Sequence, residues 1–135
     1  MKTTKIIYWI TTALIFLFEG VLVALTSHTE FAIEGLRHLG YPAYFGPLVA
    51  VFKVTGALVL IVPAFKGRVK EWAYAGFGIV FISAAVSHAS VDGFGGQTLF
   101  PIIAFAILVA SYVTYQKLQN AGEEIVSGLQ PEPAV

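Results

Sequence analysis

The stretch IIYWITTALIFLFEGVLVAL, residues 6–25, decides the fold class of this sequence. It is apolar almost throughout, and it is long enough to cross the hydrocarbon layer of a bilayer as a helix, which takes about 20 residues. Three further apolar runs follow, over residues 45–62, 72–89 and 98–115. None of them alternates like a barrel strand, and a backbone in lipid must satisfy its own hydrogen bonds. We therefore predict an all-α membrane protein, a four-helix transmembrane bundle formed by residues 1–117.

The composition agrees with residence in a membrane. Of the residues, 57% are hydrophobic and 12% are charged, and the mean hydropathy is +0.79. The formal net charge is zero and no basic stretch could follow a phosphate backbone, so we expect no nucleic-acid partner. Because cysteine is absent, disulfides, thiol relays and iron–sulfur ligation are excluded in this chain. We expect the lipid bilayer as a partner, and we consider membrane or redox proteins and a second copy of the chain as further partners.

Basic residues predict the orientation. They precede the first run, separate the second from the third, and follow the fourth: Lys2, Lys5, Lys66, Arg68, Lys70 and Lys117. Only Arg37 lies in a connection on the other side. Since cytoplasmic connections carry the excess of Lys and Arg, we predict a multi-pass cell-membrane protein with both termini cytoplasmic.

The first run is longer than the apolar core of a signal peptide, so we expect it to be retained as a span. Residues 118–135, which contain few large apolar side chains, predict a mobile cytoplasmic tail.

The first outer connection, residues 27–44, predicts a short helix over roughly residues 29–38. Thr29 can cap its beginning, and Gly40 and Pro42 can end it. Apolar residues recur on one side of this segment, so the helix should lie on the outer membrane surface. An irregular polar loop is the alternative.

Ionisable residues inside the apolar runs indicate a site, because each costs about 2.5 to 3.5 kcal/mol to insert. At about 1.5 Å of rise per residue, Glu19 and Lys53 lie roughly 9 Å and 12 Å from the outer ends of their runs. The two side chains are therefore at similar depths and can pair. The third run brings Ser87 and His88 to the same outer half, and Asp92 follows one turn later. We take these five residues as a candidate ligand-binding site or buried polar cluster.

The cluster supports more than one interpretation. A pair of Glu19 with Lys53 can bind a ligand, or it can serve only to hold two helices in register. His88 can likewise form a local hydrogen bond at a helix end, or it can hold a ligand or transfer a proton.

A metal site is a further alternative. It would combine His88 and Asp92 with His28 or His38, but the spacing matches no recognised ligand motif. We therefore assign no metal ligand and no catalytic residue, and we expect no autonomous enzymatic activity.

Four segments resemble the DoxX-like family of small four-span membrane proteins. They are LGYPA at 39–43, FKVTGA at 52–57, KEWAYAG at 70–76 and SHASVD at 87–92. The likeness covers about residues 5–116 and leaves out the tail. It implies a four-helix membrane bundle. Relatives named for the founding member are linked to quinone-coupled sulfur oxidation and to redox-stress complexes, whereas distant animal relatives are more like assembly chaperones of the endoplasmic reticulum.

The resemblance also bears on single residues. Lys53, Glu71, His88 and Asp92 fit recurring polar positions of the family pattern. Glu19 departs from it, because many relatives have a small or hydroxyl residue there. The resemblance therefore implies that the pairing of Glu19 with Lys53 is peculiar to this chain.

Two functions follow from these residues. In the first, the protein is a membrane-embedded binding subunit in which Lys53 and His88 hold an oxygen-bearing ring, with a quinone as the candidate cofactor. Aromatic residues should line that site: Phe16, Phe18, Phe52, Phe81 and Phe94. In the second, the protein is a non-catalytic scaffold or assembly factor. Passage of protons or solutes ranks last, because the inner half of the runs is expected to be nearly all apolar.

Overall fold

The computed structural model describes residues 2–129, and within that range the chain consists of helices joined by short connections. The elements are α1 (Lys2–Ile15), the π-helical segment η1 (Phe16–Val21), α2 (Leu22–Thr26), α3 (Glu30–His38), α4 (Phe45–Ile61), α5 (Arg68–Asp92) and α6 (Gly96–Leu129). The first three follow one another without a break and form one rod. Each of the four apolar runs is helical, which confirms the all-α fold class.

Helix length separates α4 from the other long helices. Within residues 2–129, three helical stretches are long and apolar enough to cross a membrane: Lys2–Thr26, Arg68–Asp92 and Gly96–Leu129. Helix α4 is apolar but has 17 residues. It therefore rises about 25 Å, a few ångströms less than the roughly 30 Å hydrocarbon layer.

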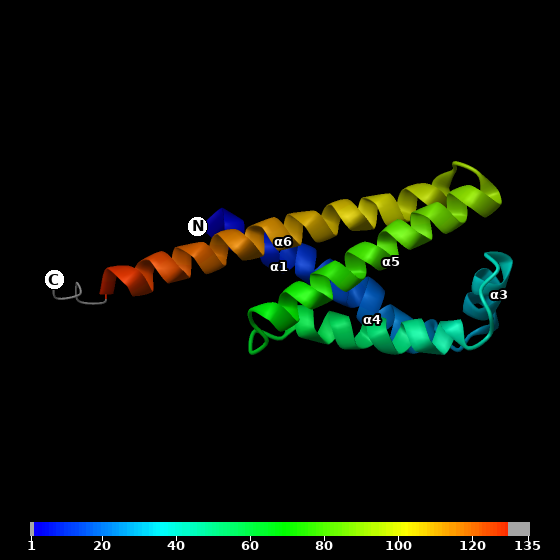
Figure 1. Ribbon diagram of the computed structural model, residues 1–135, viewed down its shortest axis with the longest axis horizontal. Coiled ribbons are helices and arrows are strands. Elements are labelled where there is room, and N and C mark those ends of the chain that lie inside the picture. The colour runs from blue at the N-terminus through cyan, green and yellow to red at the C-terminus, as the bar shows by residue number, and fades with distance from the viewer. Residues whose placement is uncertain (1, 130–135) are drawn as a thin grey trace.

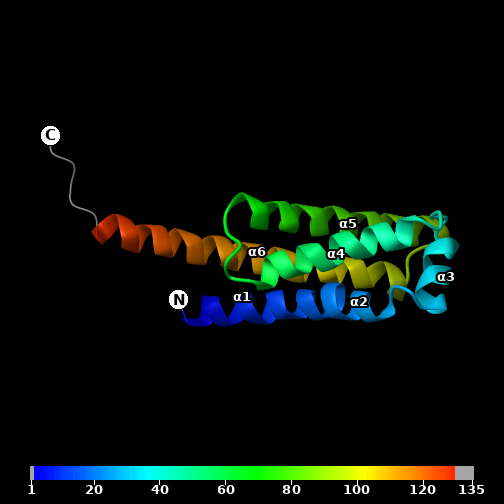
Figure 2. The ribbon, with the colours of Figure 1, turned by 90° about the horizontal axis from the view of Figure 1, so that it is seen from below.

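The long helices pack side by side around α6 and α4. Helix α6 lies along both α1 and α5, while α4 packs against η1 and α5. Figures 1 and 2 show that the beginning of α1 and the end of α6 lie at one end of the molecule. The short helix α3 lies at the opposite end, where α4 begins and α5 ends (Figure 1). The two ends of the molecule are therefore built differently.

The short helix predicted over roughly residues 29–38 is confirmed as α3. It begins after Thr29, whose hydroxyl accepts a hydrogen bond of 3.3 Å from the amide of Ala32, as expected of an N-cap. It ends before Gly40, which adopts a φ of +91°, a left-handed conformation that glycine reaches without strain.

The C-terminal segment differs from the sequence-based prediction. Helix α6 does not end near residue 117 but continues to Leu129, and its last turns extend away from the other helices (Figures 1 and 2). No proline occurs between Lys117 and Pro131, and a single glycine such as Gly122 costs a helix only about 1 kcal/mol. A helix that begins in the bundle therefore continues into this segment. The last six residues of the expected tail, 130–135, lie outside the described residues.

A glycine sets the distance between the first rod and α4. A Cβ atom at Gly20 would lie 2.9 Å from the Cβ of Ala57, closer than carbon atoms can approach. Ala57 itself is completely buried. Only glycine allows η1 and α4 to cross at this distance, and the crossing places the residue before Gly20 beside α4.

Candidate functional site

Glu19 and Lys53 form an ion pair where η1 crosses α4. The Nζ atom of Lys53 lies 2.8 Å from Oε2 of Glu19, and only 8% of Glu19 is exposed. Glu19 belongs to the π-helical segment, a form that is rare and is frequently found at functional sites. The Oε2 atom has no partner in hydrogen-bond geometry within residues 2–129, so the contact is electrostatic.

A polar cavity of about 180 Å³ lies beside this pair. It is bordered by residues of η1, α4, α5 and α6: Glu19, Lys53, Val80, Phe81, Ala84, His88, Gln97, Phe100, Pro101 and Ala104. Three of the five predicted site residues, Glu19, Lys53 and His88, are therefore brought together around one space.

His88 borders this cavity and has a polar atom without a partner. Its Nδ1 is buried and has no hydrogen-bond partner within the described part of the chain. The nearest carboxylate oxygen, Oδ2 of Asp92, is 3.7 Å away, which is too far for a hydrogen bond. A buried polar atom without a partner costs about 1 to 3 kcal/mol. Such atoms in folded proteins normally have a ligand or a water molecule beside them.

The beginning of α6 adds an acceptor that the sequence-based reasoning missed. Pro101 lies inside α6 and has no amide hydrogen, so the carbonyl oxygen of Gln97, four residues earlier, lacks its usual helical donor. Both residues border the cavity. A proline four residues after a polar residue, at the beginning of an apolar run, is the signal that could have identified this position.

Ser87 and Asp92 lie near His88 in the sequence but do not border the cavity. The Ser87 hydroxyl is hydrogen-bonded to the hydroxyl of Tyr41, and Asp92 accepts a hydrogen bond from Nε2 of His38. Both partners come from α3 and the turn that follows it. The predicted cluster thus divides into a cavity group, Glu19 with Lys53 and His88, and an outer group that joins α3 to α5.

The aromatic lining also differs in part from the prediction. Phe81 borders the polar cavity as expected, together with Phe100, which was not predicted. Phe18 borders an adjoining apolar cavity of about 80 Å³ that shares Glu19 with the polar one. Phe94 is 86% exposed, so its place in the predicted lining is wrong. A phenylalanine beyond the end of α5 cannot reach back over the outer group.

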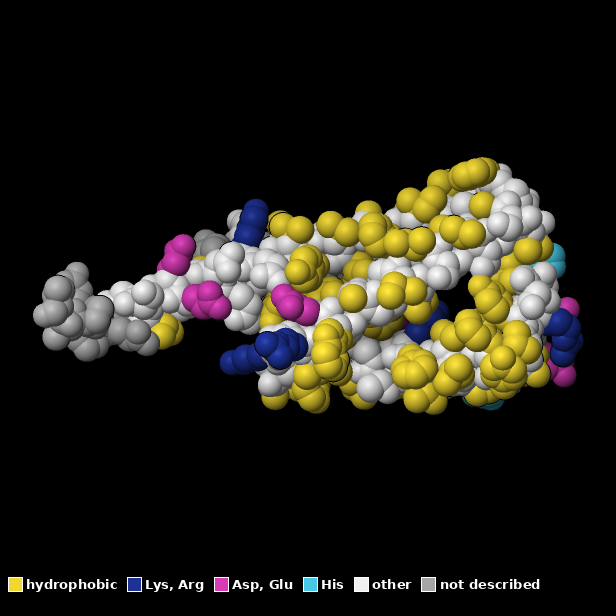
Figure 3. Space-filling view, in the orientation of Figure 1, with side chains coloured by type: hydrophobic (Ala, Val, Ile, Leu, Met, Phe, Trp, Pro, Cys, Tyr) yellow, Lys and Arg dark blue, Asp and Glu magenta, His cyan; other side chains and the backbone are white. Residues whose placement is uncertain are grey.

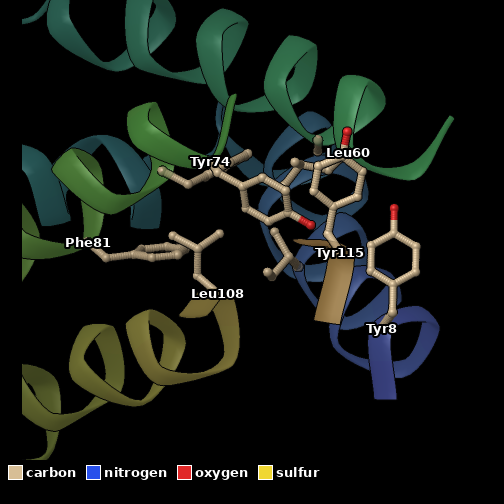
Figure 4. Packing of buried hydrophobic residues seen from close by; sticks show 9 residues of the cluster. Tyr8, Leu60, Tyr74, Phe81, Leu108 and Tyr115 are labelled. Atoms are coloured by element: carbon tan, nitrogen blue, oxygen red, sulfur yellow. The ribbon is translucent and has the colours of Figure 1, made fainter. Parts of the chain in front are cut away.

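A second polar group lies nearer the beginning of α1 and the end of α6, in the half of the molecule that was expected to be the inner, apolar one. Lys70 is only 3% exposed, and its Nζ donates a 2.8 Å hydrogen bond to the hydroxyl of Tyr8. The same nitrogen lies 5.5 Å and 5.2 Å from the ring centroids of Tyr8 and Tyr115, within the range of cation–π attraction. Figure 4 shows these two tyrosine rings side by side in the core.

Hydroxyl groups continue this inner polar group between three helices. The Ser111 hydroxyl is hydrogen-bonded to those of Thr12 and Tyr74, at 2.7 Å in each case. Three pairs of residues, each four positions apart in one helix, supply the group: Tyr8 with Thr12, Lys70 with Tyr74 and Ser111 with Tyr115. That spacing was visible in the sequence, and it places each pair on one side of its helix. The expectation of an apolar inner half is therefore wrong.

The remaining predicted positions lie elsewhere. Glu71 accepts a 3.0 Å hydrogen bond from the side chain of Gln116 and is not part of the polar cavity. Within residues 2–129, no group of three or more acidic or histidine side chains could hold a metal ion.

Comparison with known protein families identifies the family of this chain. The family model described as the DoxX-like family matches residues 7–111, which is most of the chain and includes the whole polar cavity. No curated protein and no solved structure matches the sequence.

Proposed function

This chain belongs to the DoxX-like family, and from that premise we propose that it is a membrane-embedded binding subunit for a quinone-like ligand in a redox-associated complex. The ligand ring occupies the polar cavity between Lys53 and His88. The protein contributes binding and orientation, while a bound quinone supplies the electron-transfer chemistry.

The proposal includes four passages through the cell membrane, with both termini in the cytoplasm. The apolar residues 62–65, VPAF, follow α4 and can complete the passage that this short helix begins. The even number of passages is supported by the beginning of α1 and the end of α6, which lie at the same end of the molecule (Figure 2). The excess of Lys and Arg at that end supports a cytoplasmic location.

One observation carries the choice of ligand: His88, whose Nδ1 is buried and without a hydrogen-bond partner within residues 2–129, borders the same cavity as the charge-neutral pair of Glu19 and Lys53. Ammonium and imidazole N–H groups donate hydrogen bonds to carbonyl oxygens, and a quinone presents two such oxygens. Because Glu19 and Lys53 together carry no net charge, the cavity favours a neutral ligand over an ion.

The size and lining of the cavity fit a single substituted ring. Drug-sized ligands occupy pockets of about 300 to 1,000 Å³. The polar cavity, at about 180 Å³, is smaller, so it suits only the ring of a quinone. Phe81 and Phe100 border it, and aromatic side chains pack favourably against a planar ring.

The test is quinone binding by the purified full chain in detergent. Lipids extracted from the preparation should contain quinone by mass spectrometry, and added quinone should quench tryptophan fluorescence with saturation. His88→Leu should weaken binding about tenfold or more, as expected for the loss of a hydrogen bond of about 1.5 kcal/mol or more. The double variant Glu19→Gln with Lys53→Met should do the same without leaving a lone buried charge.

The matched control is Lys66→Met, because Lys66 is an exposed lysine outside the cavity. It should bind quinone as the unaltered protein does. Absence of quinone binding by the unaltered protein would rule out the proposal, as would equal binding by the cavity variants and the control.

A scaffold or assembly role is a second candidate, and a separate observation favours it. The end of α6 extends beyond the bundle, and three apolar residues there are 65%, 55% and 80% exposed: Ile125, Val126 and Leu129. Such residues on a protruding helix can pack against another protein. If the protein is a scaffold or assembly factor, truncation after Lys117 should abolish co-purification of its partner proteins and leave quinone binding unchanged.

A further inference from the structure

We propose that the ligand of the polar cavity is an amphiphile with a long apolar tail, and that the tail lies in a groove between α4 and α5 that opens to the lipid. This inference rests on the proposed function for the ring, and it adds the chemical class of the ligand and its path of entry.

The groove has a volume of about 530 Å³. Its lining comes only from α4 and α5: Val49, Phe52, Lys53, Thr55, Gly56, Val59, Val69, Trp72, Ala73, Gly76, Phe77 and Val80. Lys53 is the only charged residue among them. The Thr55 hydroxyl already donates a 2.7 Å hydrogen bond to the carbonyl of Val51, so it needs no further partner. The groove therefore suits a hydrocarbon chain.

The groove and the polar cavity share two lining residues. Lys53 and Val80 border both spaces. The ammonium group of Lys53 reaches Glu19 at the cavity, and its apolar methylene stem can line the groove. A ligand whose ring lies in the cavity can therefore extend its tail into the groove without crossing another polar group.

The dimensions and openings of the groove fit a tail in the membrane. From Val49 to Val59, α4 rises about 15 Å, which is enough for several isoprene units. Phe52 and Trp72 border the groove and are 66% and 73% exposed, so it opens sideways from the bundle. Figure 3 shows a hollow on this face with a basic side chain inside it. In a bilayer this opening faces lipid, where a long-tailed quinone resides.

The small side chains of the groove leave room that a lipid tail can fill. A Cβ atom at Gly76 would meet nothing within 4 Å. Without a hydrophobic driving force inside the bilayer, a tail gains free energy here by close packing against the walls of the groove. A larger residue at position 76 would occupy that space and would not clash with the backbone.

The experiment compares two probes, a methoxylated benzoquinone without a tail and the same ring with a tail of several isoprene units. Binding of both is measured in the same detergent to the unaltered chain, to Gly76→Phe and to the milder Gly76→Leu. Gly122→Phe is the matched control, since a Cβ there also meets nothing within 4 Å and position 122 lies on α6, away from the groove. Each probe partitions into the same detergent micelles whichever variant is present. A difference in binding between variants therefore does not come from partitioning of the probe.

We expect Gly76→Phe to weaken binding of the tailed probe about tenfold, as the loss of about two buried methylene contacts would. Binding of the tailless probe should not change, and Gly122→Phe should affect neither probe. A tailed probe with a photoreactive end should label the segment 69–80 of the unaltered chain. If Gly76→Phe proves unstable by thermal melting, Gly76→Leu should show the same selective loss to a smaller degree.

Three results would overturn the inference. Equal binding of the tailed probe by the unaltered chain and both Gly76 variants would place the tail elsewhere, and the proposed ring site would remain if both probes bind. A change of oligomeric state in Gly76→Phe, with tail binding unchanged, would assign the groove to a second copy of the chain. Failure of both probes to bind the unaltered chain would remove the proposed function itself.

Discussion

Replacing Lys53 by methionine should destabilise the protein more than replacing Glu19 by glutamine, and the double replacement should cost less than either. The reason is the unequal burial of the two partners. The side chain of Glu19 is 11% exposed and that of Lys53 is 23% exposed. Each single variant leaves one charge behind, and the cost depends on how well that charge can reach water.

The magnitudes follow from this difference. A buried charge left without its partner costs about 3 to 5 kcal/mol, and Lys53→Met leaves the more deeply buried Glu19 in that position. Glu19→Gln leaves a lysine whose long side chain can turn toward the membrane surface, so we expect about 1 to 3 kcal/mol. The double variant places two neutral side chains of similar volume in the same space, and its cost should be near zero.

Thermal unfolding in detergent, followed by tryptophan fluorescence, gives the comparison. Each kcal/mol should shift the midpoint by a few degrees in a chain of this size. The control variants Lys66→Met and Glu123→Gln each remove one exposed charge. They should shift the unfolding midpoint little, alone or together. The coupling between the two cavity residues is the difference between the double variant and the sum of the single variants.

A double variant as unstable as the sum of the two singles would show that Glu19 and Lys53 do not interact, and it would refute the reasoning. Equal effects of the two single variants would refute the argument from burial, even if the coupling is large. If the double variant is stable but no longer binds a ligand or a partner, the ion pair has a functional role beyond holding the helices in register.

Three other variants and fusions test the fold. Gly20→Ala should lower the unfolding midpoint by the equivalent of about 1 to 3 kcal/mol, because the added methyl group would overlap Ala57, whereas Gly122→Ala should be neutral or slightly stabilising. Ser111→Ala should cost about 1 to 3 kcal/mol because it leaves two buried hydroxyl groups without their partner; an unchanged midpoint would contradict the inner polar group. A fluorescent reporter that folds only in the cytoplasm should be bright when fused after Lys117, and a dark fusion would reverse the predicted orientation.

Much of the fold was predictable because the properties that specify it are local. An apolar run long enough to cross a bilayer forms a helix whatever its neighbours are, since the backbone has no other way to satisfy its hydrogen bonds in lipid. The short helix α3 was predictable for the same reason: Thr29 and Gly40 act on the few residues next to them. The similar depths of Glu19 and Lys53 also follow from counting residues along two helices.

The partner of a side chain depends instead on how each helix is rotated and where it crosses the next. His88 and Asp92 are one turn apart, yet Asp92 is bonded to His38, and this contact brings together residues 54 positions apart. The inner polar group depends in the same way on the packing of α1 and α5 against α6. Spacing in the sequence shows which residues share one side of a helix, but it does not show which side faces a neighbour.

The sequence alone therefore determined that the chain is helical, where its apolar segments lie and which charges reach the same depth. Only the tertiary structure decided that Lys53 borders both a polar cavity and an apolar groove. The physical reason is that both spaces form between helices. Their shape depends on close approaches such as Gly20 against Ala57, and these arise from packing over the whole bundle rather than from any one segment.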